Sequence, residues 1–313
     1  MRFVHRFSQA ILTVFLALAL LSPGRVVAAE PMPVVATFSI LGDMVQTIGG
    51  ARVQVTTLVG PNGDPHVFRP TPRHAQAMAG ATLVFANGLG FEGWMERLVE
   101  ASGFRGRMIL VSQGIETLEA EGHHDHQHQH KASNDHGAPD PHAWHDLGNG
   151  KIYARNIAAA LIAADPPGKG FYEQRRDAFV LEIAALEQEL AASLATLPPG
   201  PHRVVTSHDA FGYFDHAYGI EFLAPQGVST EAEASAKDLA GLIRQIRGQK
   251  VAAVFLENIA DPRLIEQIQR ETGARIGGTL YSGSLSEPDG PAATYLAMMR
   301  HNISALLAAL RGK

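Results

Sequence analysis

The chain has 313 residues, a formal net charge of −5, no cysteine and 15 histidines. The lack of cysteine excludes a disulfide scaffold, thiolate metal chemistry and a lipoprotein anchored through a lipidated cysteine. The acidic balance argues against nucleic acid as a partner and is compatible with attraction of cations.

The first 29 residues have the features of a secretory signal peptide. Arg2 and Arg6 give a basic start, Ile11–Leu21 is almost entirely apolar, and Val27-Ala28-Ala29 offers small residues for cleavage before Glu30. An uncleaved anchor is the alternative, but the apolar run is shorter than the roughly 20 residues that span a bilayer. This segment holds three of the 26 Lys and Arg residues and none of the 31 acids, so residues 30–313 carry a formal charge of −8. We expect an exported, periplasmic protein.

Strand and helix patterns alternate in the first part of the mature chain. Thr71 and Pro72 form an N-cap followed by proline at the first helical position, which predicts a helix to Ala79. Strands are expected at 34–38, 53–59 and 82–86, and a further helix at 40–49. Such β-α units predict a parallel sheet covered by helices.

The last part of the chain repeats this order. Strands are expected at 203–208, 220–224 and 251–256, and helices at 211–218 and 235–247. Val34-Val35-Ala36-Thr37 and Val204-Val205-Thr206-Ser207 occupy equivalent places, which indicates a weak internal duplication.

A different segment separates the two parts. Phe171–Leu197 carries apolar residues at helical spacing between two Pro- and Gly-rich boundaries. A helix of this length is about 40 Å long, enough for a spine between two lobes, although an ordinary packing helix is the alternative. We therefore predict two α/β lobes, residues 30–165 and 201–313, each a parallel sheet flanked by helices. One long linking helix, residues 168–198, joins them.

A histidine-rich loop occupies residues 121–138 of the first lobe. Its histidines are His123, His124, His126, His128, His130 and His136. Imidazole is neutral and ligating near pH 7, so this composition indicates an auxiliary metal-binding segment, zinc first. The alternative is a solvated, dispensable polar loop.

Three histidines outside this loop stand where ligands of α/β proteins gather. His66 and His208 follow predicted strands, and His142 lies in Asp140-Pro141-His142-Ala143-Trp144. Ligands in open α/β sheets bind beyond the carboxyl ends of strands, so the three imidazoles could meet around one metal ion between the lobes. Each histidine alone is weak support, because a loop histidine is more often a capping or surface residue.

The motifs around these histidines resemble one family. They are Pro65-His66-Val67-Phe68, Asp140-Pro141-His142-Ala143-Trp144, Ser207-His208-Asp209-Ala210-Phe211-Gly212-Tyr213, Phe255-Leu256-Glu257-Asn258 and Thr279-Leu280-Tyr281-Ser282-Gly283-Ser284-Leu285-Ser286. In this order, over essentially the whole mature chain, they resemble the TroA-like periplasmic binding proteins of zinc and manganese ABC transporters. The histidine-rich loop resembles that of the zinc-specific branch.

The resemblance implies that His66, His142 and His208 are the metal ligands. Three imidazoles suit zinc, whereas manganese prefers more oxygen donors. Many relatives complete the site with an aspartate where this chain has Gly283, which has no donor. Water, Glu257, Asp64 or a histidine of the loop could take the fourth place.

The expected function is capture of Zn²⁺ and its delivery to the membrane permease of an ABC importer by a monomer, with a periplasmic metallochaperone as a further partner. A manganese or other divalent-metal binding protein of the same family is the alternative. A secreted zinc hydrolase with a three-histidine site is a candidate from another class, but the chain has no His-Glu-x-x-His helix. A metal-free adhesin would leave the three histidines unexplained.

Overall fold

β1 (Met32–Phe38) is the central strand of the N-terminal half, and every residue from Val34 onward is buried. This computed structural model describes residues 30–119, 138–249 and 251–312. Four parallel strands form the sheet in the order β2-β1-β3-β4. A run of apolar residues without alternation is typical of a strand covered on both faces. The other strands are β2 (Val53–Val59), β3 (Leu83–Ala86) and β4 (Arg107–Leu110), and the helices of this half are α2 (Ser39–Gly49), α3 (Pro72–Ala79) and α4 (Met95–Ser102).

The C-terminal half repeats this topology. Its sheet has the order β6-β5-β7-β8, again parallel, so β5 holds the place that β1 holds in the first sheet. The predicted internal duplication is therefore confirmed as a shared strand order. The strands are β5 (Arg203–Val205), β6 (Glu221–Leu223), β7 (Ala253–Glu257) and β8 (Ile276–Leu280), and the helices are α7 (Gly212–Tyr218), α8 (Ala236–Gly248), α9 (Pro262–Thr272) and α10 (Tyr295–Leu310).

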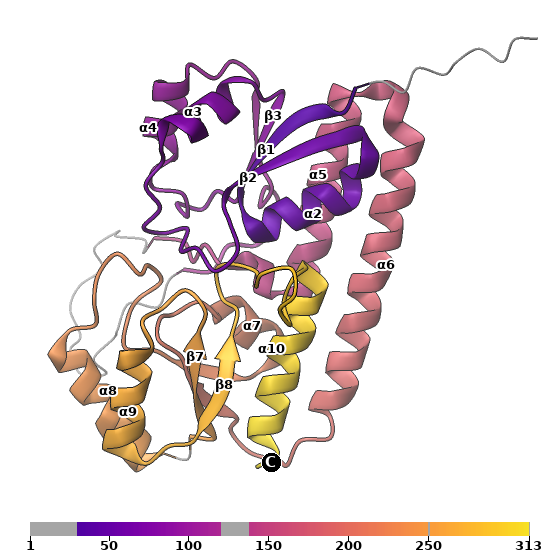
Figure 1. The fold of residues 1–313 in the computed structure, drawn as a ribbon. Helices are drawn as coiled ribbons and strands as arrows, with labels where there is room; N and C mark the ends of the chain where they lie inside the picture. Colours follow the sequence, from indigo (N-terminus) through magenta and orange to yellow (C-terminus); the bar gives the residue numbers. More distant parts are fainter. Residues whose placement is uncertain (1–29, 120–137, 250, 313) are drawn as a thin grey trace, which may run out of the picture. The chain divides into compact units, whose positions relative to one another are not determined.

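A helical pair connects the two sheets. α5 (Leu147–Ala164) leads through a short turn at Pro166–Gly168 into α6 (Lys169–Leu194), which runs alongside both halves (Figure 1). α6 packs against α2 and α5 and against α10 of the C-terminal half. Its 26 residues correspond to about 39 Å. The predicted long helix is confirmed as an element, and it ends at Leu194, a few residues before Pro198 and Pro199, which cannot continue a helix.

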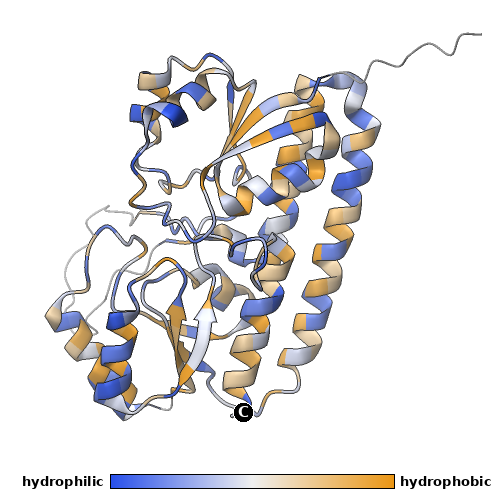
Figure 2. Ribbon diagram, viewed as in Figure 1, coloured by the Kyte–Doolittle hydropathy of each residue, from blue (hydrophilic) through white to orange (hydrophobic). Residues whose placement is uncertain are grey.

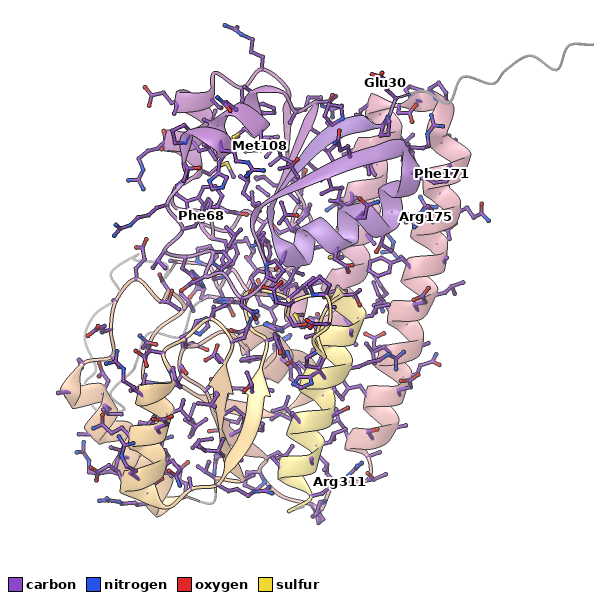
Figure 3. The ribbon with its side chains drawn as sticks, in the orientation of Figure 1. Glu30, Phe68, Met108, Phe171, Arg175 and Arg311 are labelled. Carbon is purple, nitrogen blue, oxygen red and sulfur yellow. The ribbon has the colours of Figure 1, made fainter. Side chains whose placement is uncertain are left out.

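Contacts at the start of α6 attach it to the N-terminal half. Arg175 Nε donates a hydrogen bond to the carbonyl oxygen of Thr47 at 2.6 Å, and its guanidinium lies 5.6 Å from the centre of the Phe171 ring (Figure 3). Arg52 and Asp165 form a bidentate ion pair beside the same end of the helix. Such contacts oppose bending between α6 and the first sheet.

Residues Pro31–Lys313 form one compact unit. One large apolar core includes residues of both sheets, of α5, α6 and α10 and of the loops between them. A separate small cluster lies between the second sheet and α8 and α9. Hydrophobic residues accordingly concentrate on the strands and on the packed faces of the helices (Figure 2). Within the described residues, none of the helices combines the length and apolar character needed to cross a membrane.

Candidate metal centre

His66 lies in the loop that follows β2, and this loop is held by its neighbours. Asp64 Oδ1 accepts a hydrogen bond from the backbone nitrogen of His66 at 2.9 Å. Trp94 Nε1 donates to the carbonyl oxygen of Pro65 at 2.8 Å, and the Phe91 ring meets the imidazole edge-on at 4.8 Å between centroids. The imidazole is therefore fixed by backbone and aromatic contacts.

His142 precedes the short helical turn Ala143–His145 that leads into α5. Asp140 Oδ1 accepts from the backbone nitrogen of His142 at 2.9 Å and lies 2.8 Å from its Nδ1. This carboxylate orients the ring and directs Nε2 away from Asp140. A carboxylate on the far nitrogen of an imidazole is a common arrangement behind metal-binding histidines.

His208 follows β5 and has the same kind of partner. Glu257, the last residue of β7, lies with Oε2 2.8 Å from His208 Nδ1, and both side chains are fully buried. Its Oε1 accepts hydrogen bonds from the backbone nitrogens of Ser207 at 2.7 Å and His208 at 3.0 Å. His208 Nε2 is buried and has no hydrogen-bond partner among the described residues. A buried nitrogen without a partner costs free energy, and a bound metal ion would remove this cost.

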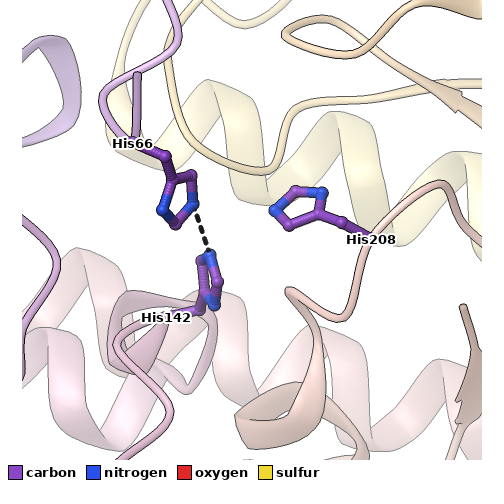
Figure 4. A group of neighbouring side chains, drawn as sticks. All are labelled: His66, His142 and His208. Carbon is purple, nitrogen blue, oxygen red and sulfur yellow. Dashed lines mark hydrogen bonds between the residues drawn. The ribbon is translucent and has the colours of Figure 1, made fainter. Parts of the chain in front are cut away.

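The three imidazoles meet at one point, each from a different segment (Figure 4). One ring nitrogen from each of His66, His142 and His208 lies within 4.8 Å of the others. The Nε2 atoms of His66 and His142 are 3.2 Å apart. A tetrahedral zinc with bonds of about 2.05 Å separates two ligands by about 3.3 Å, so this spacing fits a shared ion.

Burial and charge set the protonation of the trio. Burial lowers the pKa of His66 to about 2 and that of His142 well below its usual value. Burial also acts on His208, but the charge and hydrogen bonding of Glu257 outweigh it, so the His208 pKa is raised. The same pairing outweighs burial at Glu257 and lowers its pKa to about 2. Two imidazoles are thus held neutral, and the third can carry a proton.

Gly283 lies in the loop after β8, against the segment that carries His66. A Cβ placed at this position would be 3.5 Å from Pro65 Cδ, next to His66, and 2.8 Å from the flexible end of Ile259. The preceding carbonyl of Ser282 accepts hydrogen bonds from Trp144 Nε1 at 3.0 Å and contacts His145 Nε2 at 2.9 Å. The loop is therefore anchored to the segment that carries His142.

The other residues named from the sequence lie elsewhere. Glu257 lies against Nδ1 of His208, and Asp64 accepts from the backbone nitrogen of His66. Neither is part of the group of converging ligand atoms. Two further histidines make other contacts: His145 is buried against Ser282, and His74 accepts from the backbone nitrogen of Thr71 to cap α3. The histidines of the histidine-rich loop lie outside the described residues, namely His123, His124, His126, His128, His130 and His136.

Sequence reasoning assigned no role to two polar residues that position His142. Asp140 was visible in the motif, directly before Pro141-His142, and this spacing was the available signal. Asn87 donates to the carbonyl oxygen of Pro141 at 2.8 Å and accepts from the Tyr153 hydroxyl at 2.5 Å. Nothing in the local pattern around Asn87 pointed to this contact, which links residues 54 positions apart.

Known proteins share this architecture along nearly their whole length. Residues 34–309 match the family described as ZnuA, zinc-uptake complex component A, periplasmic. The iron ABC transporter substrate-binding lipoprotein MtsA of Streptococcus pyogenes serotype M1 is 32% identical over 301 residues, covering 94% of each chain. The manganese ABC transporter substrate-binding lipoprotein PsaA of Streptococcus anginosus is 30% identical over 282 residues, covering 88% of each.

Solved structures agree with this match. The Mn-bound periplasmic metal binding protein from Candidatus Liberibacter asiaticus superposes with a TM-score of 0.77 at 31% identity, over 88% of this chain and 98% of that chain. The periplasmic zinc binding protein TroA from Treponema pallidum gives a TM-score of 0.80 at 29% identity, over 90% and 99%. The fold and the match define a substrate-binding protein of a metal ABC importer. The chain belongs to the ZnuA/TroA family of periplasmic metal-binding proteins.

Proposed function

We propose that this protein binds Zn²⁺ through His66, His142 and His208 and delivers it to the permease of an ABC importer. The convergence of three buried imidazoles, one with an unpaired Nε2, carries this proposal. The nearest carboxylates, Asp140 and Glu257, face the Nδ1 atoms of their histidines and stand behind the ligands. A donor set of neutral nitrogens favours zinc over manganese, which prefers oxygen.

The relatives carry names with different metals, so metal choice needs its own test. MtsA is named for iron, PsaA for manganese and TroA for zinc. Residues 30–313 are titrated by calorimetry with Zn²⁺, then with Mn²⁺, and zinc is titrated again in the presence of excess Mn²⁺. We expect one tight zinc site that excess Mn²⁺ does not displace. Displacement of zinc by manganese would favour the alternative substrate.

Two variants test the ligand assignment. His142→Ala removes a nitrogen of the trio and is expected to abolish the tight site. His216→Ala, on α7 and outside the trio, is the matched control and should bind zinc like the parent chain. Equal binding by both variants would contradict the assignment.

We propose an auxiliary role for the histidine-rich loop, namely weak capture of zinc near the site. Deletion of residues 123–136 separates this role from an essential one. A tight site retained after deletion supports the auxiliary role. Loss of the tight site would mean that the loop supplies a ligand, in place of the carboxylate that Gly283 lacks.

We propose that residues 1–29 direct export to the periplasm and are removed before Glu30. Mass spectrometry of the protein from a periplasmic extract tests this, since cleavage gives the mass of residues 30–313. Retention of the full-length mass in the extract would contradict cleavage.

The proposed partners follow from the importer role: a zinc permease as the acceptor of the metal, and a metallochaperone as its donor.

A further inference from the structure

The trio is not uniformly shielded from solvent. His142 and His208 are completely buried, whereas His66 retains 6% of its exposure. A metal arriving from solvent therefore reaches His66 first. The route to this side of the trio decides how metal is loaded and released.

Two cavities adjoin His66, and they differ in charge. The first, about 380 Å³, is lined by His66, Val67, Phe68, Arg69, Trp94, Arg97 and Glu231. Arg69 and Arg97 are exposed and form no ion pair within the described part of the chain. Two guanidinium groups beside this cavity repel a divalent cation.

The second cavity, about 320 Å³, has a different lining. It joins His66 to exposed residues, including Gly90, Gly93 and Ala138. Glu231 is its one charged residue apart from the imidazole, and the remaining lining residues are uncharged. This cavity therefore joins exposed residues to the least buried imidazole of the trio, and its lining carries a single carboxylate, which suits a divalent cation.

Glu231 is held in place through the same residue that holds His66. Its neighbour Thr230 donates a hydrogen bond to Asp64 Oδ2 at 2.6 Å, while Asp64 Oδ1 accepts from the backbone nitrogen of His66. The Glu231 backbone nitrogen donates to Ser229 Oγ at 3.2 Å. Its exposed side chain makes no hydrogen bond or ion pair with any residue that the structure describes. The backbone of Glu231 is thus held in place, while its carboxylate is available to bind a cation.

We propose that Glu231 is a transfer ligand, which coordinates the divalent cation within this cavity and passes it to His66. The proposal rests on the zinc-binding function proposed above. Glu231 is not among the converging atoms of the described trio, so it acts during loading and release rather than in the final complex. Carboxylate oxygen is a good transient ligand for zinc, and three imidazoles hold the ion after transfer.

Stopped-flow kinetics of residues 30–313 with zinc alone test the proposal. The chain has two tryptophans, and both report on the site. Trp94 hydrogen-bonds to Pro65, and the Trp144 ring lies 5.3 Å from that of His142. Their fluorescence follows association with zinc and dissociation into excess chelator. Glu231→Gln is compared with Glu233→Gln, an exposed acid of the same loop that lines neither cavity.

We expect Glu231→Gln to slow association and dissociation by the same factor, about tenfold. A transfer ligand lowers the barrier in both directions, so the equilibrium affinity stays near that of the parent, and Glu233→Gln behaves like the parent. Slower association with unchanged dissociation would mean that Glu231 only attracts the cation electrostatically without coordinating it, which would overturn the proposal. Faster dissociation would make it a permanent ligand, which also overturns it, as would rates equal to the parent. If the parent chain binds no zinc, the proposed function itself fails, which is a separate outcome.

Discussion

Two histidines of the proposed metal site each have a carboxylate on the far nitrogen, but the pKa values of the two carboxylates are shifted in opposite directions. Burial raises the pKa of Asp140 to about 6, whereas Glu257 is held ionised beside His208. His208 is consequently the ligand that most readily carries a proton in the metal-free protein. Its release of that proton is the chemical cost of metal binding.

Zinc binding should release about one proton when the pH lies below the raised pKa of His208. His66 and His142 are already neutral, because their pKa values are lowered, so they release none. As the pH rises through the pKa of His208, the released fraction falls to zero and zinc affinity reaches its plateau. Calorimetry at several pH values in buffers of different ionisation enthalpy measures the count. Release of two or more protons would contradict these protonation states.

Glu257→Gln removes the charge that raises the pKa of His208. We expect fewer released protons at pH 6.5 and zinc affinity weaker by about 10–100-fold, because the imidazole loses its orienting carboxylate. Both readouts come from the same titration. Glu271→Gln, an exposed acid on α9, is the control and should change neither. Weaker binding with an unchanged proton count would mean that Glu257 only orients the ring.

Gly283→Asp should strengthen metal binding. The backbone here has no positive φ, and the new Cβ meets only the flexible end of Ile259 and ordinary contact with Pro65. An aspartate can therefore be placed beside the trio, where it adds an oxygen donor and a negative charge. We expect affinity to rise about tenfold, equivalent to about 1.4 kcal/mol, and manganese to gain more than zinc.

Competition titration with a chelator measures this change, with Gly283→Ala as the control. Alanine makes the same demand on Ile259 but supplies no ligand atom, so its affinity should match or fall slightly below that of the parent. Equal affinities of the aspartate and alanine variants would show that position 283 does not reach the metal.

At the scale of the elements, α6 is stabilised by one buried stripe. Leu186 is 2% exposed in the large core, while Leu181 on the same helix is 70% exposed. Leu186→Ala should lower the free energy of unfolding by about 2–4 kcal/mol through lost burial and the cavity left behind. Leu181→Ala should stay within about 0.5 kcal/mol of the parent. Urea denaturation followed by circular dichroism checks both, and similar effects of the two variants would contradict the packing of α6.

Elements with a capping signal or a β-branched composition could be predicted from the sequence, whereas α5 could not. The helix from Pro72 to Ala79 has the predicted bounds because Thr71 caps it and Pro72 takes its first position. The strand from Val53 to Val59 has them because it is rich in valine and threonine, which favour strands. α5 carries small and apolar residues around much of its surface, so it lacks the contrast between faces that periodicity detects. α10 is similarly apolar, and the sequence predicts a helix around His301 without giving its bounds.

The candidate site shows the same division. His66, His142 and His208 stood out because each followed a strand or lay in a motif with Pro and Asp. The contact between Asp140 and His142 is local, two residues apart, whereas the contact between Asn87 and Pro141 depends on tertiary packing. So does the approach of Glu231 to His66, since these residues come from different halves of the chain. A single sequence gives no measure of such distances.

At the scale of the whole molecule, the two apolar cores predict uneven stability. The large core joins both sheets, α5, α6 and α10, whereas six residues form the cluster beneath α8 and α9, namely Val205, Leu242, Ile246, Val254, Ile265 and Ile268. A layer held by so few apolar contacts opens at lower free energy than the rest. We therefore expect amide hydrogens of α8 and α9 to exchange faster than those of α10, which belongs to the same half but packs on the large core.

Hydrogen exchange of residues 30–313 with and without zinc measures this difference. Zinc should slow exchange in the loops that carry His66, His142 and His208, because opening any of them would break a bond to the metal. It should leave α8 and α9 largely unchanged, since their cluster can open without separating the three ligands. Protection of α8 and α9 equal to that of α10 would mean that the C-terminal half opens only as one body. In that case loading and release would require the whole half to move, and a single carboxylate beside His66 could not set their rates.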